Sequence, residues 1–216
     1  MAIWGRFRRA LDRVLNLTQN SIQDRIVPEV RAMNVRADYK PEKLAELILY
    51  ASKRCEDSGT FGKTLLYKIL FYSDFIHYGD YGSPITGTTY AHLPKGPAPE
   101  GEQFGEARNL LLEKGRVRIG TVDFKGYPQE RTIALDEADM SIFSMQETAT
   151  IDGVIDALKC HTATNVSDFS HKDIPWLLTR NGEEIPYHAV FVRRQEPVPM
   201  EYLAMIQDAA RAKGIT

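Results

Sequence analysis

The chain contains 216 residues, of which 43% are hydrophobic and 26% are charged. These proportions are ordinary for a globular protein and exclude a disordered chain, a collagen-like chain and a disulfide scaffold. Its 27 basic and 29 acidic residues leave a net charge of −2, so no overall basic field is available to bind nucleic acid. The sequence shows neither an apolar run of membrane-spanning length nor a signal peptide, and we expect a cytoplasmic protein without membrane association.

Positive charge is concentrated in residues 1–40, which hold seven arginines and one lysine against four acidic residues. The apolar residues of this segment follow the three-and-four spacing of one helix face. They include Trp4, Phe7, Leu11, Val14 and Leu15. The pattern predicts a basic amphipathic helical extension in front of a domain formed by residues 41–216. We expect its apolar face to pack on that domain or on a second copy of the chain, with a membrane surface, a toxin or nucleic acid as alternatives.

The segments that follow predict a helical domain. A first helix is expected from Pro41 to about Cys55, and a second from Gly62 to about His77. Because apolar residues cover more than one face of the second helix, it should be the central buried helix of the domain. Residues 79–101 are rich in glycine and proline, which predicts stiff loops.

A β-hairpin is expected next. A helix over residues 104–114 should end at Gly115 in a left-handed conformation. Alternating residues then predict two strands, over 116–122 and 131–135, joined by a glycine turn. The predicted fold class is therefore mainly α, of the α+β type: a compact helical domain with one small β-hairpin near residues 116–135.

The C-terminal part predicts further short elements. A helix is expected to begin at Asp136, and residues 170–173 have the form of a capping box in front of the helix that contains Pro175. A short strand over 187–192 and a closing helix over 197–212 complete the expected order.

The sequence offers little catalytic chemistry. The five histidines and two cysteines show no zinc-site spacing, and no nucleophile or nucleotide motif is present. We therefore expect no metal, no cofactor and a protein that is not an enzyme. Asp74 and His77 form the one pair compatible with an acid–base site, because residues three apart on a helix can touch. The favoured interpretation is that the two polar groups satisfy each other, or a nearby loop backbone, at the edge of the core.

Four segments share their order and spacing with one known family. They are the apolar helix Leu65–His77, the Tyr81–Tyr90 segment with its Pro-Ile-Thr-Gly turn, the Gly96–Pro99 turn and the Phe169–Trp176 segment. Together they resemble the Panacea domain of SocA-like antitoxins. The positions that match the family's motifs are expected to be structural. These are Asp74, His77, Pro84, Thr86, Gly87, Gly96, Pro97, Ser170, His171 and Trp176.

The resemblance implies an antitoxin of a bacterial or phage toxin–antitoxin system, which neutralises a cognate protein toxin by direct binding. Other members of the family repress their own operon or deliver the toxin to a protease, so a protease is a further candidate partner. DNA binding is not expected, because no helix-turn-helix pattern is visible. Aromatic and arginine side chains commonly anchor protein interfaces. On that basis the candidate toxin-binding residues are Trp4, Phe7, Arg8, Tyr81 and Tyr90.

Overall fold

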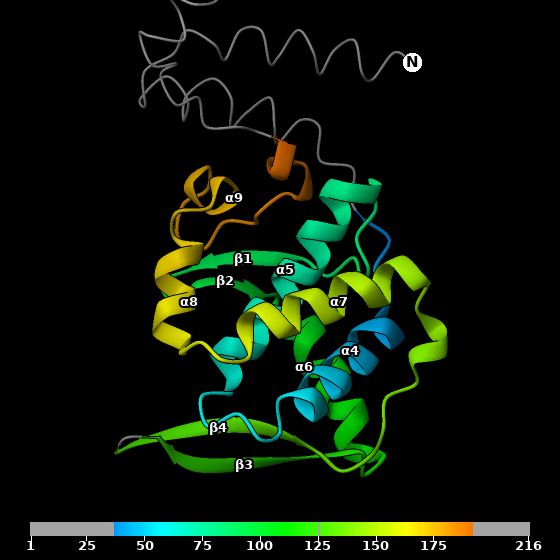
Figure 1. Cartoon of the computed structure of the whole chain (residues 1–216). Helices are drawn as coiled ribbons and strands as arrows, with labels where there is room; N and C mark the ends of the chain where they lie inside the picture. Colours follow the sequence, from blue (N-terminus) through cyan, green and yellow to red (C-terminus); the bar gives the residue numbers. More distant parts are fainter. Residues whose placement is uncertain (1–36, 125, 192–216) are drawn as a thin grey trace, which may run out of the picture.

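Helix α5 (Lys63–Tyr81) lies at the centre of the computed structural model, which describes residues 37–124 and 126–191 (Figure 1). Ten of its 19 residues are buried, on more than one side of the helix. Neighbouring elements must therefore cover it on several faces, and this confirms the predicted central helix. The helix continues one turn beyond the predicted end and stops at Gly82, whose φ of 76° is the left-handed conformation of a glycine cap.

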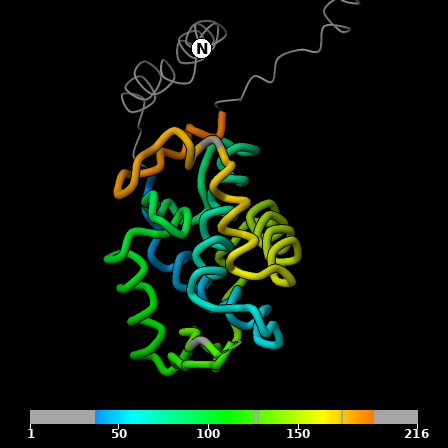
Figure 2. Tube along the Cα trace, turned by 90° about the vertical axis from the view of Figure 1, so that its left-hand side faces the viewer, coloured from blue at the N-terminus to red at the C-terminus, as the bar shows by residue number. Residues whose placement is uncertain are grey.

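The other helices pack around α5 and form the mainly helical fold that the sequence predicts. Helix α4 (Pro41–Arg54) lies against α5. Figure 2 shows α6 (Gly101–Glu113) and α7 (Met145–Leu158) on opposite sides of these two helices. Two short helices follow α7, namely α8 (Ala163–Ser170) and α9 (Ile174–Leu177). The apolar core lies between these elements.

The predicted β-hairpin is present. Strand β3 (Val117–Phe124) pairs antiparallel with β4 (Tyr127–Ala134), and Gly126 between them has a φ of 83°. The preceding helix α6 is stopped by Gly115, whose φ of 65° confirms the expected left-handed glycine. Most of β3 is exposed, so the hairpin projects from the edge of the helical layer (Figure 1).

A second hairpin corrects the prediction of a single one. Strand β1 (Tyr90–Leu93) pairs antiparallel with β2 (Gly96–Pro99). Both strands lie in the segment of residues 79–101, for which the glycines and prolines had predicted loops. Proline is tolerated here because Pro97 and Pro99 lie opposite His92 and Tyr90, whose backbone groups bond to residues 182–185 on the other edge of β1. These two register positions therefore require no N–H from β2.

The helix expected from Asp136 begins later in the chain. The carboxylate of Asp136 accepts a hydrogen bond from Arg116 Nε at 2.9 Å, and a 3₁₀ turn, η2 (Met140–Ile142), follows. Helix α7 starts after Ser144, whose Oγ accepts a bond from Glu147 N while the Glu147 carboxylate accepts one from Ser144 N. This capping box sets the start of α7.

Two further predictions are wrong. Ser170 does not cap the helix that contains Pro175, because it is the last residue of α8 and its Oγ donates to Ser167 O at 2.9 Å. The segment predicted as a strand is the 3₁₀ helix η3 (Tyr187–Phe191). Its burial does not alternate, because Tyr187, His188 and Ala189 are all buried, and strand-like pairing occurs earlier, at the Ala91–Glu184 bridge.

The predicted extension lies outside the described residues except for residues 37–40, and the closing helix over 197–212 lies outside them entirely. Within the described part of the chain, no helix has the length and apolar character needed to cross a membrane.

Candidate functional site

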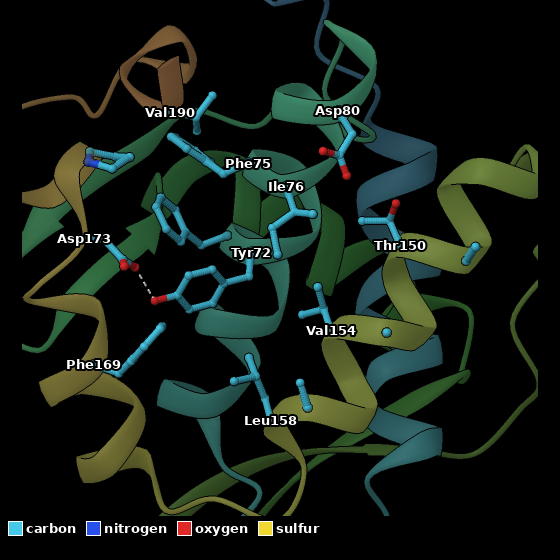
Figure 3. A pocket seen from close by; sticks show the side chains of 15 residues that line it. Tyr72, Phe75, Ile76, Asp80, Thr150, Val154, Leu158, Phe169, Asp173 and Val190 are labelled. Atoms are coloured by element: carbon cyan, nitrogen blue, oxygen red, sulfur yellow. Dashed lines mark hydrogen bonds between the residues drawn. The ribbon is translucent and has the colours of Figure 1, made fainter. Parts of the chain in front are cut away.

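An apolar groove of about 720 Å³ opens between α5, α7 and α8 (Figure 3). Its walls come from distant parts of the sequence: Tyr72 and Ile76 from α5, Val154 from α7, Phe169 from α8 and Val190 from η3. The side chains of Ile76 and Phe169 are 45% and 58% exposed. Large apolar side chains exposed beside a groove are typical of surfaces that contact another molecule.

Small residues on one face of α7 create the open space. Ala149, Gly153 and Ala157 recur at intervals of four residues, so they lie on one side of the helix, and all three line the groove. A Cβ atom added at Gly153 would meet no heavy atom within 4 Å. The groove is therefore a direct consequence of the α7 sequence, because larger side chains at these positions would fill it.

Tyr72 and Asp173 form the polar part of the groove wall. The Tyr72 hydroxyl donates to Asp173 Oδ2, as the dashed line in Figure 3 shows. Burial raises the pKa of Asp173 above its usual value, and burial together with the neighbouring carboxylate raises the pKa of Tyr72. The bond ties α5 to the connection between α8 and α9. The ring of Phe169 lies on the same side of α5, with its centroid 6.2 Å from that of Tyr72.

Asp74 lies on the buried side of α5 and is fully enclosed. Its Oδ1 accepts a hydrogen bond from Thr86 N at 2.7 Å, and its Oδ2 accepts bonds from the hydroxyls of Thr86 at 2.5 Å and Tyr90 at 2.8 Å. Burial raises the pKa of Asp74, while the bonds from Thr86 and Tyr90 act in the opposite direction. This carboxylate connects α5 to the Pro-Ile-Thr-Gly turn and to β1.

The alternative of an acid–base site at Asp74 and His77 is therefore wrong. His77 is 5% exposed, and its Nδ1 lies 2.6 Å from Ser83 O, so it is bonded to the loop rather than to Asp74. An acid–base pair needs access to a substrate, and Asp74 has none. Both residues join α5 to the loop that follows it. Asp74 and His77 bond to neighbouring groups and not to each other.

Other motif positions meet around a buried lysine. Lys68 is 1% exposed, and its Nζ donates to Pro97 O at 2.7 Å. Burial lowers the pKa of Lys68 to about 7. A Cβ added at Gly96, where φ is 89°, would lie 2.4 Å from Ser170 Oγ and 2.7 Å from Lys68 Nζ. Only glycine fits at this contact between β2, α5 and α8.

The remaining motif residues also join elements. Trp176 stacks with His92 and His171 at ring centroid distances of 3.9 Å and 4.3 Å, which places α9 against β1. Pro84 is buried in the turn after α5. Gly87 has a φ of 69°, and a Cβ there would lie 2.1 Å from Asp38 O.

The structure separates the predicted toxin-binding residues. Tyr81, at the end of α5, is 56% exposed, and its ring centroid lies 4.7 Å from that of His77. Tyr90 is 1% exposed and bonded to Asp74, so its side chain is part of the core and not of the surface. Trp4, Phe7 and Arg8 lie outside the described residues.

The groove was not predicted from the sequence. One signal was available in the four-residue repeat of small side chains in α7. The contributions of Ile76 and Phe169 could not be found in this way, because they depend on how α5 and α8 pack.

An apolar groove on a small helical domain is typical of proteins that bind other proteins. The family model described as "Antitoxin SocA-like, Panacea domain" matches residues 66–177, just over half of the chain. The chain therefore belongs to the SocA-like antitoxin family with a Panacea domain. The matched segment runs from α5 into α9 and contains the α7 and α8 walls of the groove. No curated protein and no solved structure matches the chain.

Proposed function

We propose that this protein is an antitoxin that neutralises a cognate protein toxin by binding it directly through the α5–α7–α8 groove. The observation that carries the proposal is the open apolar groove within the segment matched by the antitoxin family. Its side chains suit packing against an apolar helix or loop of a partner. Ile76 and Phe169 are the candidate anchors, and exposed Tyr81 lies in the last turn of the same helix as Ile76.

The polar groups of the groove suit recognition rather than catalysis. Tyr72 and Asp173 are bonded to each other on one side of the groove, and Asp80 and Thr150 lie on the other side, with Ile76 between the two polar pairs (Figure 3). Among the described residues, no cluster of histidine, cysteine or acidic side chains could hold a metal ion. These polar groups would orient a bound segment, and apolar burial would supply most of the affinity.

Co-expression with the product of the neighbouring gene tests this function. The protein should restore growth when that product is toxic, and the two proteins should co-purify. Phe169→Asp should abolish both effects, because it places a charge in the apolar contact. Leu135→Asp is the matched control, since Leu135 is 56% exposed and does not line the groove. It should retain both effects.

Other outcomes separate the alternative mechanisms. Rescue without a complex, together with a fall in toxin transcript, would indicate operon repression. Rescue with a shortened toxin half-life that depends on a cellular protease would indicate delivery to that protease. Equal rescue by Phe169→Asp and Leu135→Asp would contradict the assignment of the groove.

A further inference from the structure

Strand β3 forms the outer margin of the β3–β4 hairpin, and β4 lies between it and the helices (Figure 1). The inner strand is bonded to the loop between α4 and α5. Gln129 Nε2 donates to Thr60 O at 3.2 Å, and Arg131 Nη2 donates to Gly59 O at 2.6 Å. These bonds hold β4 against the domain, so the edge of β3 that faces away from β4, its free edge, is held in a fixed position.

The backbone groups of β3 alternate between its two edges. Leu135 N donates to Arg116 O at 2.8 Å, which makes these two residues a hydrogen-bonded pair that continues the β3–β4 register. Every second residue after Arg116 therefore bonds to β4, and the N–H and C=O groups of the intervening residues point to the free edge. These outward residues are Val117, Ile119, Thr121 and Asp123. Among the described residues, no backbone group of another element bonds to them.

The free edge lacks the usual features that prevent edge strands from pairing with other chains. All eight residues of β3 pair one to one with β4, so no bulge bends the strand away, and the strand contains neither proline nor lysine. Ile119 and Val122, which lie on opposite faces of the strand, are 38% and 36% exposed. A straight, exposed strand with unpaired backbone groups is a template for a further strand.

The residues of β3 favour a second copy of this chain as that further strand. The two charged residues of β3, Arg118 and Asp123, have opposite signs, so the edge has no net charge that would repel its own copy. Val117 is buried, and the exposed outward residues run from Ile119 to Asp123 with Thr121 at their centre. A two-fold axis between antiparallel strands places one residue opposite its own copy. Here that residue is Thr121.

Pairing centred on Thr121 brings compatible side chains together. Ile119 of one copy then exchanges backbone hydrogen bonds with Asp123 of the second copy, and the reverse pair forms by symmetry. On the other face Arg118 lies opposite Phe124 of the second copy, and a guanidinium group is attracted to an aromatic ring. No two like charges are opposite each other in this register, and each contact away from the axis occurs twice.

We propose that two copies of this chain associate through their β3 strands and form a continuous four-stranded antiparallel sheet of order β4–β3–β3–β4. No residue of β3 lines the α5–α7–α8 groove, so both grooves of such a dimer stay open. The association is therefore independent of the function proposed above.

Sedimentation velocity of the full-length chain over a concentration series tests the association. Because one pair of strands buries less area than a standard interface, we expect a dissociation constant of about 10 μM. Thr121→Pro should abolish the dimer, since it removes an outward N–H, and it should preserve the hairpin because that N–H does not bond to β4. Thr121→Ser keeps the N–H and should dimerise like the unchanged chain. Circular dichroism of the variants checks that each is folded.

Charges introduced at Ile119 test the register. Ile119→Glu places a carboxylate opposite Asp123 of the second copy and should weaken the dimer about tenfold, because the unfavourable pair occurs twice. Ile119→Lys places a cation opposite the same carboxylate and should strengthen the dimer by a similar factor. These two variants change no backbone group, so they test the pairing even if Thr121→Pro does not fold. Equal weakening by both would overturn the pairing.

Other outcomes would also overturn the proposal. One is a chain that stays monomeric over the whole concentration series, and another is a Thr121→Pro variant that dimerises as well as Thr121→Ser. A monomeric chain whose toxin binding is weakened by Thr121→Pro would show that the edge takes a strand of the toxin instead. Phe169→Asp, which alters only the groove, should leave the dimer unchanged. A dimer that binds no toxin would support this association while the proposed function fails.

Discussion

Tyr72 and Asp173 are 101 residues apart in the sequence, and a hydrogen bond joins them across the wall of the groove. The bond connects the central helix α5 to the segment between α8 and α9, so a largely buried helix holds one wall of the open groove. The shape of the groove therefore depends on the same contacts that stabilise the fold.

Removing the Tyr72 hydroxyl should weaken this connection. We expect Tyr72→Phe to lower the free energy of unfolding by about 1–2 kcal/mol, because the partly buried Asp173 carboxylate loses its donor. Tyr78→Phe is the control, since Tyr78 packs by its ring against Tyr187 and Phe191 and keeps these contacts as phenylalanine. Urea unfolding of the three proteins measures the difference. An equal change in both variants would contradict a structural role for the bond.

The buried Lys68 predicts a distinctive pH dependence of stability. Its pKa falls from 10.5 to about 7 in the folded protein, so between these values the unfolded chain binds a proton that the folded chain does not. Stability should therefore rise with pH across this window, by up to about 1.4 kcal/mol per pH unit. Lys68→Met removes the titrating group and keeps the apolar stem. It should be more stable than the unchanged protein at pH 7, by a margin that shrinks towards pH 10.

Unfolding free energies of the two proteins at pH 7, 8 and 9 test this prediction. The other titrating groups are common to both proteins and cancel in the difference. A stability difference that stays constant with pH would show that Lys68 titrates at the same pH in the folded and unfolded chains.

The Gly96 contact predicts a large effect from a single methyl group. We expect Gly96→Ala to cost about 3 kcal/mol, because the added Cβ meets Ser170 Oγ and Lys68 Nζ and φ is positive. Gly126→Ala is matched in backbone conformation, with a φ of 83° and no atom within 4 Å of the new Cβ. It should cost only about 1 kcal/mol. Similar unfolding temperatures for the two variants would show that Ser170 and Lys68 move enough to accommodate the added methyl group.

The enclosed Asp74 predicts a structural rather than a catalytic phenotype. Asp74→Asn should lower the free energy of unfolding by about 2–4 kcal/mol, since an amide N–H would face one of the donors from Thr86 or Tyr90. Asp80→Asn, on the exposed rim of the groove, should change it by no more than about 0.5 kcal/mol. Denaturant titrations distinguish the two, and equal values would contradict the network around Asp74.

Local sequence patterns predicted much of the fold. The continuous apolar run of α5 indicated a helix buried on several sides, and alternation indicated the β3–β4 hairpin. The second hairpin was missed because Pro97 and Pro99 are unfavourable in strands unless their positions need no donor. That condition depends on residues 182–185, which bond to the far edge of β1 and lie too far along the chain for a local pattern to include.

The candidate site was harder to predict because packing decides it. Tyr90 is a residue type that often anchors interfaces, but here its hydroxyl donates a hydrogen bond to the buried carboxylate of Asp74, and its side chain is part of the core. Phe169 and Ile76 resemble core residues, yet the small side chains of α7 leave them facing an open groove. The motif residues could be selected from the sequence because their order and spacing resemble those of one family, but their contacts depend on how distant elements pack.

The most direct test of the central claim is the dissociation constant of the purified complex with the toxin, measured by titration calorimetry for two matched variants. Gly153→Leu fills the groove, whereas Gly105→Leu places the same side chain in α6, away from the groove, and neither new Cβ meets an atom within 4 Å. We expect Gly153→Leu to weaken toxin binding at least about a hundredfold, the effect of losing an interface anchor, and Gly105→Leu to leave it unchanged. Equal dissociation constants for the two variants would contradict the groove as the toxin-binding site.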